Sequence, residues 1–359
     1  MAYQKHNNCM RSANERFQNN YDFLRLFAAC CILFTHSFNL LGLSSKEPLM
    51  WLSQNRYDFS FVGLCIFFSI SGYLIVKSAA TAQSFLHYCW KRFLRIQPLL
   101  IIVCMLSMLL LGPLVSSLSL TEYFSSFSTW TYGRNIFPAA GIQFKLPGVF
   151  SSNVADQGVN GSLWTLIVEE RLYILVGILF LFKKYAAKLY LLFGVLLNLV
   201  FLLSFFWKQY PFLHYFSEAP FFYALLFINA GIVYVTKVDL NRFLKFRSGL
   251  ALFMVCIVSL CMTDLTFLQP FILPLLVIAL AQAKGIANRS GQWGDFTYGV
   301  YIFSFPVQQL LIHYRFATTP SELFLTSFLL VLPLSVLSWH LLEKKILAFK
   351  NRVGIEAKG

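Results

Sequence analysis

Long apolar runs alternate with short polar segments along almost the whole chain. Each run is close to the 20 residues that an α-helix needs to cross the hydrocarbon core of a bilayer. The pattern therefore predicts an all-α fold, a polytopic transmembrane bundle of about ten spans. We expect these spans at roughly 22–42, 59–79, 98–118, 162–182, 189–206, 219–236, 248–263, 266–283, 296–314 and 323–342. A tight connection around Asp264 is expected to join the seventh span to the eighth.

The composition leaves no room for a sizeable soluble domain. Of the 359 residues, 58% are hydrophobic and 12% are charged, whereas soluble domains carry about 25% charged residues. We expect a cytoplasmic N-terminal segment (1–21), a transmembrane domain (22–345) and a cytoplasmic tail (346–359). The first apolar run contains ionisable residues and lacks a small-x-small cleavage site, so we expect it to stay as the first transmembrane helix.

The distribution of Lys and Arg predicts that both termini are cytoplasmic. With that orientation, the inward-facing segments hold 21 of the 29 Lys and Arg residues and the outward-facing segments hold six. This bias follows the positive-inside rule and explains most of the net charge of +14, so no nucleic-acid partner is expected. The sequence has no CxxC pair or Cys/His cluster, so no metal site is expected either. Nothing in the pattern predicts an oligomeric state.

Ionisable residues inside the expected spans are the first candidates for function, because they are costly in lipid. In the first span, RLFAACCILFTH places Arg25 and His36 eleven residues apart. That spacing is three helical turns plus about 20°, so both side chains share one face, about 16 Å apart along the axis. Asp22 lies one turn before Arg25 and can pair with it. The alternatives are a snorkelling anchor for Arg25 and a simple interhelical hydrogen bond for His36.

Two further motifs combine polar and apolar residues. In FFSISGYL, the residues Ser71, Gly72 and Tyr73 interrupt an apolar helix, and close helix packing is the alternative to a functional role. In KRFLRIQP, Arg92 and Arg95 share one helical face at the inner end of a span. Paired arginines suit phosphate through forked, charge-assisted hydrogen bonds, with lipid headgroups as the alternative ligand.

The segment SLWTLIVEERLYIL places two carboxylates inside the fourth span. Glu169 and Glu170 project from different sides of the helix, so only one is expected to face a cavity. Pairing of Arg171 with one of them is the structural alternative. Glu169 is expected about 8 Å below the outer interface, a depth similar to that of His36. A histidine beside a carboxylate predicts a base and the group that orients it.

The longest expected loop, roughly 119–161, faces outward. It is rich in Ser, Gly, Asn and aromatic residues, and its only acids are Glu122 and Asp156. Loops of this length usually have a function. The composition suits a sugar-like acceptor, and a lid packed on the bundle is the alternative.

Taken in order, these motifs resemble a known family, the integral-membrane acyltransferases called acyltransferase 3, which modify cell-surface glycans and related acceptors. Arg25 and His36 match its Arg-x10-His signature, and the resemblance covers residues 22 to 345. The other matching positions are Asp22, Ser71, Gly72, Tyr73, Arg92, Arg95, Pro98, Trp164, Glu169, Glu170, Tyr173, Tyr298 and Glu343. The chain departs from the family pattern at Ser304, where a His is usual, and at Arg171, where Gln is frequent.

The resemblance implies acyl transfer, usually of acetyl, from cytoplasmic acyl-coenzyme A to a hydroxyl of a glycan on the outer face. The donor is then a substrate, no cofactor is permanently bound, and the location is the bacterial inner (cytoplasmic) membrane. Arg92 and Arg95, together with Arg25, would hold the donor phosphates. His36 would be the general base or the transient acyl carrier, oriented by Glu169. Donor-path residues would be Ser71, Gly72 and Tyr73, and acceptor or supporting residues would be Asp22, Trp164, Glu170, Tyr173, Tyr298 and Glu343.

Two other functions fit a ten-span bundle. A transporter or flippase for a lipid-linked glycan would also have buried charges, but it has no need of Arg-x10-His beside a cytoplasmic arginine pair. A glycan polymerase or ligase would normally carry larger outer loops with many catalytic carboxylates or basic residues. Of these two alternatives, the transporter or flippase is the stronger.

Overall fold

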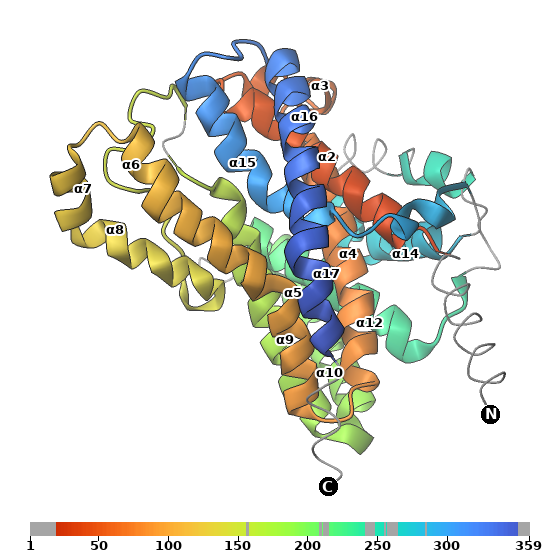
Figure 1. The fold of residues 1–359 in the computed structure, drawn as a ribbon. Helices are drawn as coiled ribbons and strands as arrows, with labels where there is room; N and C mark the ends of the chain where they lie inside the picture. The colour runs from red at the N-terminus through yellow and green to blue at the C-terminus, as the bar shows by residue number, and fades with distance from the viewer. Residues whose placement is uncertain are drawn as a thin grey trace, which may run out of the picture.

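The computed structural model describes residues 19–155, 158–207, 210, 215–240, 248–254, 256, 265–283 and 286–350. Over these ranges the chain is mainly helical and forms no β-strand (Figure 1). The principal helices are α2 (Tyr21–Asn39), α4 (Phe59–Ala80), α5 (Phe85–Leu106), α9 (Trp164–Leu181), α10 (Ala186–Phe206), α12 (Ala219–Thr236), α14 (Gln269–Gln282), α15 (Thr297–His313) and α16 (Pro320–Ser338). Shorter helices are α3 (Pro48–Leu52), α6 (Gly112–Val115), α7 (Leu120–Ser125), α8 (Phe127–Thr131) and α17 (Lys344–Leu347).

Seven of the described helical stretches are long and apolar enough to cross a membrane. They contain α2, α4, α5, α10, α12, α14 and α16. The expected spans 162–182 and 296–314 coincide with α9, which carries three successive charged residues, and with α15, which has 17 residues. Half of the expected span 248–263, the connection around Asp264, residues 1–18 and residues 351–359 lie outside the described residues. The total of about ten spans and the cytoplasmic position of the termini stay predictions.

Helix α4 lies at the centre of the bundle, where it packs against α2, α9, α12 and α14 (Figure 1). At Gly72, an added Cβ would overlap the backbone of Phe227 in α12. Only glycine therefore allows α4 and α12 to approach this closely. Helix α15 packs on α2 and α16, and α5 packs on α9 and α17. These contacts bring α2, α4, α5, α9 and α15 around one interior region.

Polar contacts at the helix ends fix the helices that carry the candidate site residues. Asn20, just before α2, donates through Nδ2 to the carbonyls of Leu280 at 2.9 Å and Ala283 at 2.6 Å. The start of α2 is thereby held on the end of α14. The carboxylate of Asp58 accepts a hydrogen bond from Phe61 N at 2.8 Å and caps α4. These hydrogen bonds hold the first residues of α2 and α4 in place.

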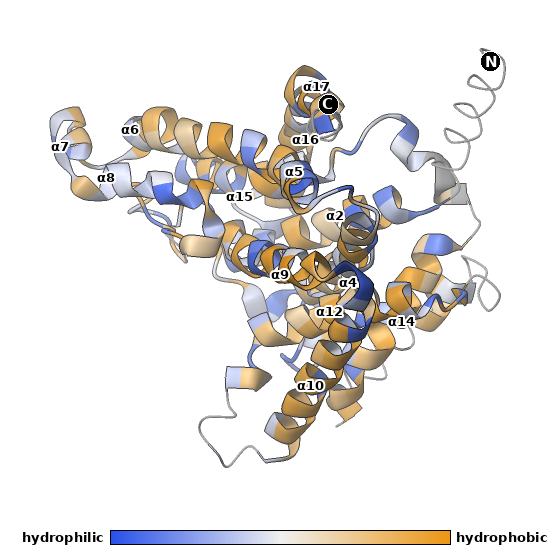
Figure 2. Cartoon of the chain, turned by 90° about the horizontal axis from the view of Figure 1, so that it is seen from below, coloured by the Kyte–Doolittle hydropathy of each residue, from blue (hydrophilic) through white to orange (hydrophobic). Residues whose placement is uncertain are grey.

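The outer faces of the long helices are strongly apolar. Figure 2 shows α10 covered by hydrophobic residues along its length. Its exposed side chains include Leu192, Val195, Leu196, Leu199 and Leu203. Exposure of such a surface to water would be energetically unfavourable, whereas contact with apolar lipid tails avoids this cost.

Candidate active site

A basic cavity of about 530 Å³ opens between α2, α4, α5, α9 and the C-terminal part of the chain. We call it the vestibule, and it is lined by Arg25, Ile70, Ser71, Leu74, Ile75, Lys91, Arg92, Arg95, Tyr173, Leu347 and Lys350. Arg92 and Arg95 are three residues apart on α5, so they share one face of that helix. Arg25 lines the same cavity as this arginine pair, and the expected role of the three arginines in holding donor phosphates stays a prediction.

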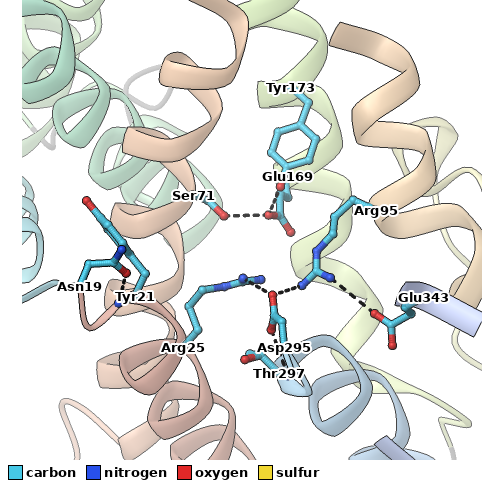
Figure 3. A network of polar contacts seen from close by, with 10 residues as sticks. All are labelled: Asn19, Tyr21, Arg25, Ser71, Arg95, Glu169, Tyr173, Asp295, Thr297 and Glu343. Carbon is cyan, nitrogen blue, oxygen red and sulfur yellow. Dashed lines mark hydrogen bonds and ion pairs between the residues drawn. The ribbon is translucent and has the colours of Figure 1, made fainter. Parts of the chain in front are cut away.

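Asp295, just before α15, joins two of these arginines (Figure 3). Its Oδ2 accepts from Arg25 Nη1 at 2.7 Å and from Arg95 Nη2 at 2.5 Å. Arg95 also pairs with Glu343 at 3.5 Å. Burial alone would raise the pKa of Asp295, but the two guanidinium groups more than offset it and hold this pKa below its usual range. Asp295 is therefore an ionised bridge between α2 and α5.

The carboxylate of Glu169 lies across the interior from this ion-pair network (Figure 3). Its Oε1 accepts hydrogen bonds from Ser71 Oγ at 2.9 Å and from the Tyr173 hydroxyl. Glu169 and Ser71 line a second cavity of about 60 Å³, together with Arg25. We call this cavity the inner pocket, and its other lining residues are Leu64, Phe67, Phe68, Thr165, Leu166, Thr297, Tyr298 and Tyr301.

The two adjacent glutamates have different environments, as their helical phase predicts. Glu170 faces away from the inner pocket and accepts from Gln97 Nε2 at 2.6 Å and from Ala139 N at 2.8 Å. Arg171 is exposed and donates through Nε to the Ala139 carbonyl at 3.3 Å. Among the ion pairs of the described residues, none joins Arg171 to either glutamate, so the structure does not support the alternative in which Arg171 pairs with one of them.

His36 lies further along α2 and is not among the residues that line the inner pocket or the vestibule. Its imidazole packs edge-to-face on Phe305 of α15, with ring centroids 5.2 Å apart. One turn earlier on α15, Tyr301 lines the inner pocket, and its hydroxyl contacts Thr165 and donates to the Ser162 carbonyl. In the described structure the hydrogen bonds of Glu169 go to Ser71 and Tyr173, and none goes to His36. The expected orientation of His36 by Glu169 stays a prediction.

Comparison with known proteins identifies the family of this chain. The family model described as an acyltransferase domain matches residues 18–340. The chain belongs to the acyltransferase 3 family. It is 30% identical to an O-acetyl transferase of Shigella phage Sf6 over 348 residues. This aligned region covers 92% of this chain and 96% of the phage protein.

A second relative is less extensive. Nodulation protein 10 of Rhizobium leguminosarum bv. viciae is 33% identical over 165 residues, which are 45% of this chain and 44% of that protein. No solved structure matches the chain. The family and the phage O-acetyl transferase show that the protein is an acyltransferase enzyme and support O-acyl transfer.

Not every predicted site residue of this acyltransferase faces a cavity. Of the three successive residues expected to line the donor path, only Ser71 does so. Gly72 is at the crossing with α12. Tyr73 stacks on Tyr21, with ring centroids 6.2 Å apart, and meets Tyr234 edge-to-face. The expectation is corrected for Gly72 and Tyr73, since successive helical residues differ by about 100° in direction.

The supporting residues also take up distinct positions. Tyr298 lines the inner pocket and donates to the Ile96 carbonyl at 3.1 Å, which joins α15 to α5. Glu343 pairs with Arg95 and accepts from Ser338 Oγ at 3.0 Å. Trp164, at the start of α9, packs 6.0 Å from the ring of Tyr223. Their expected roles in acceptor binding or support stay predictions.

Two further positions differ from simple expectation. Asp22 is turned toward Gly291, where an added Cβ would overlap its carboxylate, while the ion-pair partner of Arg25 is Asp295. The expected Asp22–Arg25 ion pair is therefore absent from the described structure. Ser304, at the position of the family His, is buried and donates to the Tyr301 carbonyl at 3.0 Å.

Sequence reasoning missed several residues of the site. Asp295 was not a candidate, because a single acid in a connecting segment has no spacing that links it to Arg25 or Arg95. Lys91 and Lys350 also add positive charge to the vestibule, although only the two arginines of KRFLRIQP were candidates. The adjacency of Lys91 to Arg92 could have identified the first of them. Among the described residues, no group of three or more His, Cys, Asp and Glu side chains could hold a metal ion.

Proposed function

We propose that this acyltransferase moves an acetyl group from cytoplasmic acetyl-coenzyme A to a hydroxyl of a cell-surface or exported polysaccharide or glycolipid. The proposal includes residence in the bacterial inner membrane with both termini in the cytoplasm. The vestibule is the observation that carries it, since five basic side chains from three parts of the chain line one cavity.

The charge of the vestibule suits a polyanionic donor. Arg92 has no carboxylate within ion-pair distance among the described residues. It lies over the ring of Tyr173, 5.8 Å from the centroid, and donates to Ser78 Oγ at 3.3 Å. A guanidinium group without a counter-charge is well suited to a phosphate, which it binds through short, charge-assisted hydrogen bonds. Coenzyme A would therefore place its phosphates in the vestibule and its thioester toward Ser71.

In this proposal His36 carries the chemistry on the acceptor side. A neutral imidazole can take the proton of an acceptor hydroxyl or receive the acyl group transiently, because its unperturbed pKa is near neutrality. Coenzyme A then leaves as the thiol. Glu169 belongs to the donor side, where its carboxylate is held by Ser71 and Tyr173.

The end of the expected outer loop supports an acceptor site near His36. Asn160 donates to the Ile302 carbonyl at 2.9 Å, and Gly161 packs against the ring of Phe305. The imidazole of His36 packs against the same Phe305 ring. A glycan bound by this segment would therefore approach the histidine from the side opposite the vestibule. The phage relative is an O-acetyl transferase, which supports a hydroxyl acceptor for this chain as well.

The test is transfer of radiolabelled acetyl from coenzyme A to membranes or purified surface glycan of the host, with NMR of the glycan to locate the new O-acetyl group. We expect His36→Ala to lower transfer at least about 100-fold while the protein remains folded in membranes. His313→Ala, on α15 beside Phe150, is the matched control. Movement of a lipid-linked glycan without acetyl transfer would contradict the proposal and favour a flippase.

A further inference from the structure

The inner pocket is mainly apolar, whereas the vestibule is basic. The apolar walls of the inner pocket are formed by Leu64, Phe67 and Phe68 of α4 and by Leu166 of α9. The two cavities share Arg25 and Ser71 as lining residues, so the inner pocket begins where the vestibule ends. A molecule that is anionic at one end and apolar at the other matches this order.

The inner pocket continues from the vestibule toward the part of the bundle that contains His36. Leu64 precedes Ser71 by seven residues on α4, which is about two helical turns. The beginning of α4 adjoins α2 close to His36, since Ser60 N donates to Thr35 Oγ1 at 2.8 Å. Leu64 and Leu166 therefore lie deeper than Ser71 along the path from donor to acceptor.

The inner pocket is small. Its volume is about 60 Å³, against about 530 Å³ for the vestibule. An acetyl thioester places four non-hydrogen atoms (CH₃, C, O and S) in this space, whereas a hexanoyl thioester would place eight. The small volume of the inner pocket therefore favours the shorter acyl chain.

The apolar walls are held by packing on their outer side. Phe68 stacks on Tyr223 with ring centroids 5.3 Å apart, and Phe67 meets Tyr301 edge-to-face at 5.7 Å. Leu166 is 2% exposed. Side chains packed in this way cannot move aside without loss of other contacts.

We infer that the inner pocket binds the acyl group of the donor and that Leu64 and Leu166 limit its length to short chains. The inference rests on the proposed use of acyl-coenzyme A. It adds a specificity site that is separate from the phosphate-binding arginines. A longer chain would have to displace the two leucines or leave its thioester short of Ser71.

The experiment compares kcat/KM for acetyl-, butyryl- and hexanoyl-coenzyme A with the full-length protein in detergent or proteoliposomes. For the wild type, we expect hexanoyl transfer at least about tenfold less efficient than acetyl transfer, since one methylene alone can change such a ratio by that factor. Leu166→Ala removes three carbons from the wall. We expect it to raise the hexanoyl-to-acetyl ratio at least about tenfold, and Leu64→Ala to act in the same direction.

Leu172→Ala is the matched control, because Leu172 is a buried leucine on α9 that lines neither cavity. Its ratio should equal that of the wild type. Each ratio is measured on one preparation, so partial misfolding of a variant cancels. Equal use of all three donors by the wild type, or unchanged ratios in both leucine variants, would overturn the inference and leave the proposed function intact. No transfer from any acyl-coenzyme A by the wild type would overturn both.

Discussion

Asp295 Oδ2 accepts hydrogen bonds from Arg25 of α2 at 2.7 Å and from Arg95 of α5 at 2.5 Å. These three side chains are 16–22% exposed, so the network is mostly shielded from solvent. The carboxylate lies between two arginines that would otherwise repel each other and holds both at the wall of the vestibule. Asp295 therefore links the position of α2 to that of α5.

Asp295→Asn should destabilise the protein and impair donor use. The substitution leaves two shielded guanidinium groups without their shared counter-charge, which costs on the order of 3 kcal/mol. We expect a lower melting temperature in detergent and a higher KM for the acyl donor. Glu218→Gln, at an exposed acid outside the site, should change neither quantity. A variant with wild-type melting temperature and KM would show that Asp295 has no positioning role.

The two glutamates of α9 should respond differently to substitution. Glu169→Gln changes the charge at the junction of the two cavities, so we expect acyl transfer to fall at least about tenfold with a nearly unchanged melting temperature. Glu170→Ala leaves Gln97 and the Ala139 amide without their acceptor, which costs about 1–3 kcal/mol. That variant should melt earlier, with the kcat of its folded fraction largely retained. The opposite pattern would assign the functional carboxylate to Glu170.

Substitutions of the two arginines of the KRFLRIQP motif should differ in their effect on stability. Loss of one charge-assisted hydrogen bond to a phosphate costs about 1.5–3 kcal/mol, so Arg92→Gln and Arg95→Gln should each raise the donor KM about tenfold or more. Only Arg95→Gln should also lower the melting temperature, because only Arg95 pairs with Asp295 and Glu343. Lys77→Gln, on α4 outside the vestibule, is the control. An unchanged donor KM in both arginine variants would exclude them from donor binding.

Gly161→Ala should slow the chemical step through Phe305. An added Cβ would lie 2.5 Å from Cε2 of the Phe305 ring, so the ring must shift. That ring packs on His36, and a shift there displaces the imidazole. We expect a lower kcat with little change in donor KM. Gly133→Ala, where nothing lies within 4 Å of the added Cβ, should behave as the wild type. Equal kcat values for both variants would argue against coupling of Phe305 to His36.

Much of the fold could be predicted because the length of an apolar run is a local property. Helices α2, α4 and α12 begin and end within a few residues of the expected spans. Helix α5 is different, since it begins at Phe85 after the cap Ser84, well before the apolar run expected from residue 98. Hydropathy detects the apolar part of a helix and not the basic turns that precede it. Those turns carry Arg92 and Arg95.

The candidate site was predictable only where spacing along one helix determines it. The shared face of Arg92 and Arg95 and the divergence of Glu169 from Glu170 follow from 3.6 residues per turn. The direction in which each face of a helix points within the bundle does not follow from this spacing. The sequence therefore could not show that Ser71, and not Gly72 or Tyr73, faces a cavity. Contacts across the chain, such as Arg25 with Asp295, depend on tertiary packing.

Arg25 and His36 are carried by the one uninterrupted helix α2. Their separation along the axis, about 16 Å, is therefore a fixed length that no loop movement can shorten. An acyl carrier anchored at the Arg25 end must itself bridge most of that length to reach the histidine. If the donor is acyl-coenzyme A, as proposed, its long arm can span this length, whereas a compact activated acid such as acetyl phosphate cannot. Under that proposal, the fixed length of α2 between Arg25 and His36 favours donors with a long arm over short ones.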